Sequence, residues 1–173
     1  MGRKKILEGK SVLIVDDNKD VLETLVEILA TCKVDVAESF DAGRKLIEKR
    51  DYDIAILDIM GVQGFRLLEK CRAKGIPSLI LTANALTSES LKKSYQNGAS
   101  YFVPKEEMSQ IEIYLEDVLE AKEQQKDPWI KWFDRFISFF DTKFSGADWR
   151  DKEREYFKKK IKTKVSVPRE EED

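Results

Sequence analysis

The sequence predicts an α/β fold in which successive β-α-β units build a parallel sheet. From Ser11 to about Lys126, short apolar runs alternate with amphipathic segments, which is the order of elements that parallel sheets require. The apolar runs are almost continuously hydrophobic, as expected of strands that helices cover on both faces. With 42% hydrophobic and 37% charged residues in 173, the composition is that of a globular protein.

Five strands and their intervening helices follow in order along this region. The expected strands are Val12 to Val15, Val34 to Ala37, Ile54 to Leu57, Leu79 to Leu81 and Tyr101 to Val103. Apolar residues at helical spacing follow the first three strands: Val21, Leu22, Leu25, Val26, Ile28 and Leu29, then Leu46 and Ile47, then Phe65, Leu67 and Leu68. Ser39 is placed to cap the second helix, while Gly75 and Gly98 stand where helices end before the next strand.

The composition changes at Asp127-Pro128, where the proline favours the start of a new helix. Ten of the seventeen aromatic residues lie between Trp129 and Phe157. We therefore divide the chain into a domain at 1–126, an aromatic-rich helical extension at 127–167 and an acidic tail at 168–173. Within the extension, Ser145-Gly146 permits a turn before a second helix, so the extension is expected to form a helical hairpin.

Apolar and aromatic side chains fill one half of the first helix of this extension. They are Trp129, Ile130, Trp132, Phe133, Phe136, Ile137, Phe139, Phe140 and Phe144. This face can fold back on the preceding domain, form a homodimer, or fill a groove in another protein. A membrane surface is less favoured, because the polar face mixes Asp with Lys. A face this wide needs a cover of some kind, since bare it would promote aggregation.

Composition excludes several classes of function. The chain has no histidine, which excludes Ser-His-Asp catalysis, phosphohistidine chemistry on this chain and His-ligated metal sites. The net charge of −2 does not favour nucleic acid as a partner of the whole molecule. Cys32 and Cys71 lack disulfide or redox spacing and indicate a reducing compartment. No signal peptide or membrane-spanning segment is found, so we expect a cytoplasmic protein.

Polar side chains follow four of the expected strands. Asp16 and Asp17 follow the first strand, Asp58 the third, Thr82 the fourth and Lys105 the fifth. In an open parallel sheet these strand ends share one edge, where such folds bind ligands. Three carboxylates gathered there repel one another unless a cation neutralises them. Mg²⁺ suits such a site because it accepts carboxylates and retains positions for water and phosphate oxygens, so the pattern indicates a phosphoryl acceptor.

Four motifs in this order resemble the receiver domain of two-component response regulators over about residues 9 to 126. They are VLIVDDN, YDIAILDIM, LILTAN and GASYFVPK. The resemblance implies a doubly wound, flavodoxin-like sheet of order 2-1-3-4-5. It also implies that Asp58 is the phosphoacceptor, taking its phosphoryl group from a sensor histidine kinase or phosphotransfer protein.

The resemblance further implies a role for each site residue. Asp17, Asp58 and the main-chain carbonyl of Met60 would bind Mg²⁺ directly, and Asp16 through water. Lys105 would pair with the phosphoryl group, and Thr82 would move toward it. Phe102 would occupy the switch aromatic position, with the output carried by the surface around the receiver's fourth helix, fifth strand and fifth helix.

Two departures from the family pattern stand beside the matches. The loop after Asp58 reaches Gly64 in six positions, two fewer than most receivers, and lacks their Met-Pro pair. Lys105 is preceded by Pro104 and followed by Glu106, so the usual Lys-Pro bond is absent and the loop must position Lys105 differently.

We therefore expect a signalling phosphoacceptor that is not an enzyme beyond self-phosphorylation and self-dephosphorylation. Its extension would serve a homodimer or a partner protein through residues 129–161, since it is too short for a winged-helix DNA-binding domain. The alternative is a receiver-like scaffold that takes no phosphate and acts through the aromatic helices, an alternative that the shortened loop favours.

Overall fold

The computed structural model describes residues 4–83, 86–144, 155–156 and 159–160. Its centre is a five-stranded, all-parallel sheet of order β2-β1-β3-β4-β5. The strands are β1 (Ser11–Val15), β2 (Lys33–Ala37), β3 (Ile54–Leu57), β4 (Ser78–Thr82) and β5 (Tyr101–Pro104). The predicted fold class and strand order are confirmed, and every expected strand lies within one residue of its predicted ends.

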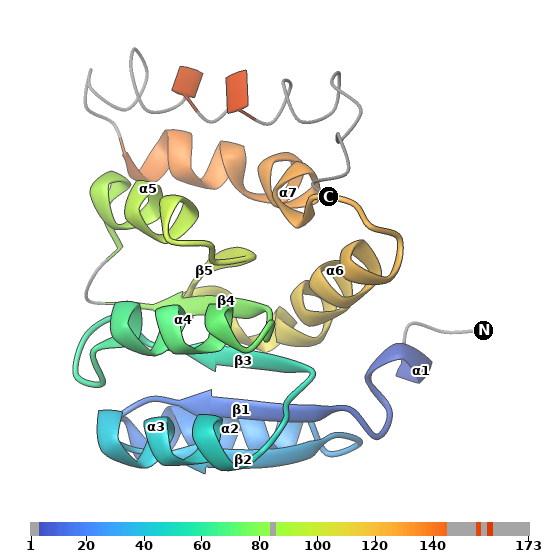
Figure 1. Cartoon of the computed structure of the whole chain (residues 1–173). Helices are drawn as coiled ribbons and strands as arrows, with labels where there is room; N and C mark the ends of the chain where they lie inside the picture. The colour runs from blue at the N-terminus through green and yellow to red at the C-terminus, as the bar shows by residue number, and fades with distance from the viewer. Residues whose placement is uncertain (1–3, 84–85, 145–154, 157–158, 161–173) are drawn as a thin grey trace.

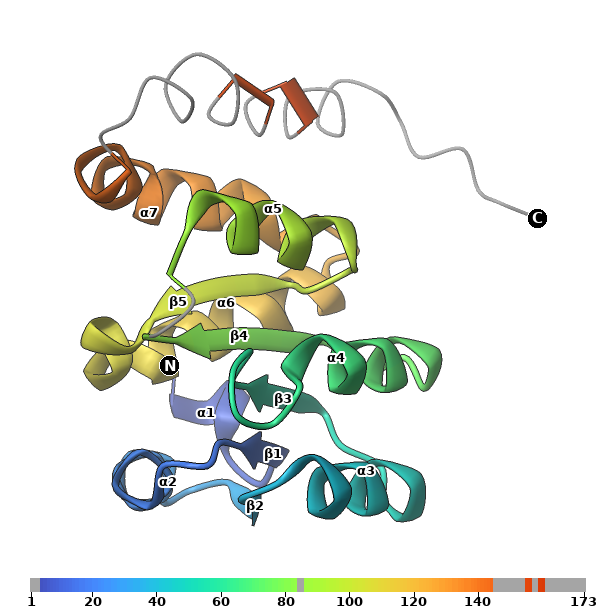
Figure 2. The ribbon, with the colours of Figure 1, turned by 90° about the vertical axis from the view of Figure 1, so that its left-hand side faces the viewer.

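Helices cover both faces of the sheet. The helices among the described residues are α1 (Lys4–Leu7), α2 (Lys19–Ile28), α3 (Phe40–Lys49), α4 (Gly64–Ala73), α5 (Ser88–Gln96), α6 (Ile111–Glu123) and α7 (Pro128–Lys143), with a 3-10 helix η1 (Lys105–Gln110). Helices α2 and α6 lie on one face, and α3, α4 and α5 lie on the other (Figures 1 and 2). The short helices α1 and η1 are additions that the hydrophobic pattern did not predict.

Local signals set the ends of several helices. The side chains of Asn18, Ser39 and Thr87 accept backbone N–H groups in the first turns of α2, α3 and α5, which satisfies donors that have no partner within the helix. Gly75 and Gly98 adopt φ values of 73° and 91° shortly after α4 and α5, a conformation that glycine adopts without steric cost. The predicted cap at Ser39 and both glycine stops are confirmed.

The core is centred on β1, β3 and β4. Every residue of β3 and β4 is buried, and so are four of the five in β1. Burial on both faces explains why these segments read as continuous apolar runs rather than as alternating ones. The carboxyl ends of these central strands therefore lie together at one edge of a buried sheet.

Helix α7 folds back on the preceding domain and lies beside the edge strand β5 (Figures 1 and 2). Asp127 caps the helix through the backbone N–H of Trp129, and Pro128 occupies its first turn. The side chains of Trp129, Trp132, Phe136 and Phe140 are buried in the common core. Of the three covers that the sequence left open for this helix, the structure shows the intramolecular one.

The second predicted helix of the extension lies mostly outside the described residues, as does the acidic tail. Four described residues of this second helix, Glu155, Tyr156, Lys159 and Lys160, are helical. The ring of Tyr156 meets that of Tyr95 on α5 edge to face, with centroids 6.3 Å apart. No helix among the described residues is long and apolar enough to cross a membrane.

Candidate phosphoryl-acceptor site

The site lies where β1, β3, β4 and β5 end, at the carboxyl edge of the sheet. The strand register brings Val15 beside Leu57, so the next residue of each strand, Asp16 and Asp58, meets across the same ladder. The backbone N–H of Asp58 donates to the carbonyl of Val15 at 3.0 Å. Parallel pairing therefore places residues that are forty-two positions apart in sequence at one point of the sheet.

Asp16, Asp17 and Asp58 form a cluster of carboxylates with one oxygen of each within 4.8 Å of the others. Asp16 and Asp58 are buried, while Asp17 is exposed. Asp16 is fixed by the backbone N–H of Asn18, which donates to it at 2.9 Å. Because Asn18 caps α2, neither aspartate before it is needed as the helix cap, and both are available to the cluster.

Lys105 is the cation of this site. Its Nζ lies 2.8 Å from Oδ2 of Asp16 and 3.3 Å from Oδ2 of Asp58. Burial acts to lower the pKa of Lys105, but the hydrogen bonds and charges of Asp16 and Asp58 outweigh it and raise the pKa. Lys105 reaches the carboxylates from the start of η1, directly after Pro104, and the described residues contain no cis peptide bond. Without the usual Lys-Pro bond, the loop therefore positions Lys105 through a 3-10 turn.

Burial and the neighbouring charge of Asp16 raise the pKa of Asp58 above its ordinary value, while Lys105 and Thr82 oppose the shift through hydrogen bonds to the carboxylate. Thr82 is fully buried at the end of β4. Three carboxylates and one ammonium leave two negative charges in this cluster, which a divalent cation would balance. Hard oxygen ligands with open positions fit Mg²⁺, and the carboxylates of Asp16, Asp17 and Asp58 are close enough together to hold such an ion.

The loop between β3 and α4 closes tightly around these carboxylates. Gly61 has a φ of 77°, and a Cβ at this position would collide with the carboxylate of Asp17. A Cβ on Gly64 would collide with the carbonyl of Asp58. Met60, the predicted main-chain ligand, is exposed. The shortened loop thus accommodates all three aspartates, and α4 still begins directly after it. The role of Gly61 was not predicted from the sequence, although a glycine between two apolar residues could have indicated a backbone position that other residues disfavour.

Phe102 lies in β5, three residues before Lys105. It is fully buried, and its ring contacts that of Phe140 on α7 at a centroid distance of 5.9 Å. Its carbonyl accepts a hydrogen bond from the indole N–H of Trp132 at 2.7 Å. The predicted switch residue is therefore in direct contact with the helical extension, a pairing that no local sequence pattern specifies.

A second polar cluster, which sequence analysis missed, joins α6 to β5 and α7. Asp117 is buried on α6 and accepts hydrogen bonds from the Tyr101 hydroxyl at 2.5 Å and from Arg135 Nε at 2.5 Å. A second Arg135 nitrogen donates to the other Asp117 oxygen at 3.1 Å, which makes the pair bidentate. Its only sequence signal is an aspartate on the apolar side of α6.

A parallel sheet of this order with an aspartate cluster, a lysine and a buried threonine at its carboxyl edge defines a receiver-type protein. A family profile described as the response regulator receiver domain matches residues 12–116, which is more than half of the chain. The chain belongs to the response regulator receiver family, as its motifs predicted.

Curated relatives include the heme response regulator HssR of two Staphylococcus aureus strains, bovine RF122 / ET3-1 and JH9. Each is 34% identical over 98 residues, which cover 54% of this chain and 43% of the relative. The chain therefore spans less than half the length of those curated relatives.

Solved structures show the same fold. The CheY-like receiver domain protein of Methanospirillum hungatei JF-1 aligns with a TM-score of 0.62 at 24% identity, over 68% of this chain and 99% of that one. The receiver domain of the Francisella response regulator 1452 aligns with a TM-score of 0.58 at 21% identity, over 66% of this chain and 99% of that one. A response regulator of Chloroflexus aurantiacus J-10-fl aligns with a TM-score of 0.58 at 29% identity, over 65% of this chain and 99% of that one.

Proposed function

We propose that this chain is the receiver of a two-component phosphorelay and accepts a phosphoryl group on Asp58. The observation that supports this most directly is the convergence of Asp58 with Asp16, Asp17, Thr82 and Lys105 on one edge of the sheet. Each of these groups has a place in phosphoryl transfer.

In the proposed step, a carboxylate oxygen of Asp58 attacks the phosphorus of a phosphohistidine on a sensor kinase or phosphotransfer protein. The P–N bond breaks as the new P–O bond forms, and the released imidazole takes up a proton. Lys105 and Thr82 would stabilise the charge on the transferred oxygens. Mg²⁺, held by Asp17, Asp58 and the Met60 carbonyl, with Asp16 acting through water, would neutralise charge at the same point. Water would later hydrolyse the acyl phosphate.

The scaffold alternative is not favoured. Its support was the shortened loop, and that loop keeps the three carboxylates together. The aromatic side chains of α7 through which a scaffold would act include Trp129, Trp132, Phe136 and Phe140, and these four are buried against the same chain. The signalling role of the chain therefore depends on the acceptor site rather than on a bare aromatic surface.

Intact-mass spectrometry after incubation with acetyl phosphate and Mg²⁺ tests this proposal. A single phosphoryl adduct is expected on the full chain, and none on Asp58→Asn or on protein treated with a chelator. An adduct of equal yield on Asp58→Asn would assign the acceptor to another residue. Failure of the full chain to form an adduct with either acetyl phosphate or a phosphorylated histidine kinase would contradict the proposal.

A further inference from the structure

Helix α7 is bound to β5 and to the segment just before it through a narrow aromatic seam and two indole hydrogen bonds. The seam consists of Trp129, Trp132, Phe136 and Phe140. The indole N–H of Trp129 donates to the carbonyl of Ala99, and that of Trp132 donates to the carbonyl of Phe102, both at 2.7 Å. Buried indoles need such partners, so the two acceptors fix the position of α7 along the strand.

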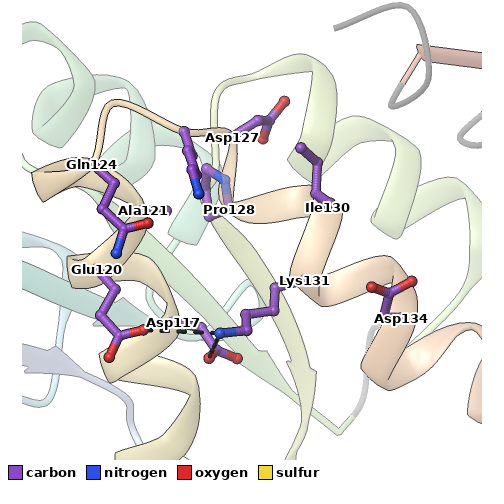
Figure 3. Close-up of a pocket in the computed structure, with 10 residues that line it drawn as sticks. Asp117, Glu120, Ala121, Gln124, Asp127, Pro128, Ile130, Lys131 and Asp134 are labelled. Carbon is purple, nitrogen blue, oxygen red and sulfur yellow. Dashed lines mark ion pairs between the residues drawn. The ribbon is translucent and has the colours of Figure 1, made fainter. Parts of the chain in front are cut away.

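Polar side chains also hold α7 in place on the side of α6. Arg135 of α7 makes the bidentate pair with Asp117, and Tyr101 of β5 donates to the same carboxylate. Lys131 lies 3.9 Å from Asp117 and 3.8 Å from Glu120, and Figure 3 shows it reaching across the groove between α6 and α7 toward both. One buried carboxylate thus ties α6, β5 and α7 together.

The surface to which α7 binds adjoins the acceptor site along β5. Lys105, which contacts Asp58, follows β5 directly. Thr82 at the end of β4 pairs with Pro104 of β5. Phe102 lies two residues earlier on the same strand, with its ring against Phe140. Any movement of Lys105 or Thr82 that a phosphoryl group imposes therefore acts on the strand to which α7 is attached.

We propose that the surface formed by α5, β5 and α6 is a helix-binding site whose ligand is the chain's own α7, and that phosphorylation of Asp58 weakens this binding. The inference rests on the proposed function. With Asp58 unmodified, the Phe102 ring is in contact with α7. A phosphoryl group adds negative charge and three acceptor oxygens beside Lys105 and Thr82. Drawing these groups inward shifts β5 and removes Phe102 from beneath Phe140.

Tryptophan fluorescence of the full chain tests the inference. The substitution Trp149→Phe leaves Trp129 and Trp132 as the only indoles. In this background, phosphorylation with acetyl phosphate and Mg²⁺ is expected to increase acrylamide quenching of their emission at least twofold. The added substitution Asp58→Asn should abolish the change.

Intact mass is measured on the same samples, so that the two proposals can fail separately. An adduct with unchanged quenching would overturn the inference and leave the acceptor function standing. Absence of an adduct, both with acetyl phosphate and with a phosphorylated histidine kinase, would overturn the proposed function and the inference with it. A decrease in quenching would also overturn it, because α7 would then be bound more tightly.

Binding of beryllofluoride, a phosphoryl mimic, provides a second test that does not depend on the tryptophans. Coupling between two sites is reciprocal, so weakening α7 should favour the phosphorylated arrangement. We expect Phe140→Leu to increase beryllofluoride affinity at least threefold. Phe133→Leu is the matched control on the same helix, since Phe133 is only partly buried and lies outside the seam. Equal affinities for the two variants would contradict the coupling.

Discussion

Gly61 and Gly75 share a left-handed backbone, with φ values of 77° and 73°, but have different surroundings. A Cβ at position 61 would collide with the carboxylate of Asp17, whereas one at position 75 would meet nothing within 4 Å. The two positions therefore separate the cost of backbone strain from the cost of displacing a candidate metal ligand.

Gly61→Ala and Gly75→Ala should each lower the free energy of unfolding by about 1–2 kcal/mol, because both place a Cβ in the left-handed region. Only Gly61→Ala should also weaken Mg²⁺ binding, on the order of tenfold, because the new Cβ moves the Asp17 carboxylate. Isothermal titration with Mg²⁺ checks this expectation. Equal Mg²⁺ affinities for the two variants would show that Asp17 is not held against Gly61 in the metal-bound site.

The two cysteines differ in burial and should differ in reactivity. Cys71 is buried in α4, and burial raises the pKa of its thiol to about 11. Cys32 is partly buried, and its pKa is raised less far. Since the thiolate is the reactive form, iodoacetamide at pH 8 should alkylate Cys32 well before Cys71. Peptide mapping by mass spectrometry measures both rates, and unfolding in urea should make them equal.

At the scale of the element, α7 is the part of the chain whose position the structure explains and the sequence left open. Its aromatic residues do not contribute equally. Phe136 is buried and contacts the rings of Tyr101 and Tyr114 at centroid distances of 6.1 and 5.0 Å, whereas Phe133 on the same helix is only partly buried. The wide apolar face consequently divides into a buried seam and a flank.

Phe136→Ala should lower the free energy of unfolding by about 3–5 kcal/mol, because it leaves a cavity between α7, β5 and α6. Phe133→Ala removes the same atoms from a partly covered position and should cost less than half as much. Urea denaturation monitored by circular dichroism gives both values. If the two variants were equally destabilised, the division of α7 into seam and flank would be wrong.

For the whole molecule, buried phenols link stability to alkaline pH. Burial, followed by the hydrogen bond to Asp117, raises the pKa of Tyr101 well above its ordinary value, and burial raises that of Tyr114 to about 12. In the unfolded chain both ionise near pH 10. The stability these phenols contribute is therefore complete below about pH 10 and is lost as the pH rises toward the folded-state values.

The difference in the free energy of unfolding between the natural protein and the Tyr101→Phe variant should accordingly decrease above pH 10, by about 1.4 kcal/mol per pH unit. Urea titrations of both proteins at pH 9, 10 and 11 provide the measurement. Titration of surface lysines affects the two proteins alike and cancels in the difference. A difference that stays constant from pH 9 to 11 would show that Tyr101 ionises equally in the folded and unfolded states.

The sequence by itself determined the sheet and the candidate site. Strands that are buried on both faces consist of continuous apolar runs, so β3 and β4 could be located from the pattern of apolar residues along the chain. Parallel strands share one carboxyl edge, so Asp58 could be grouped with Asp16 and Lys105 without any contact being known. These features could be predicted because each follows from a local pattern or from a rule of topology.

Only the tertiary structure decided which surface covers α7 and which side chains meet there. An amphipathic helix specifies that its apolar face must be buried, but it does not specify the partner, because burial of apolar surface is non-directional. The pairing of Asp117 with Arg135 and the contact of Phe140 with Phe102 depend on the distance and orientation of segments far apart in the chain. For that reason the link between the acceptor site and the helical extension became visible in the folded molecule alone.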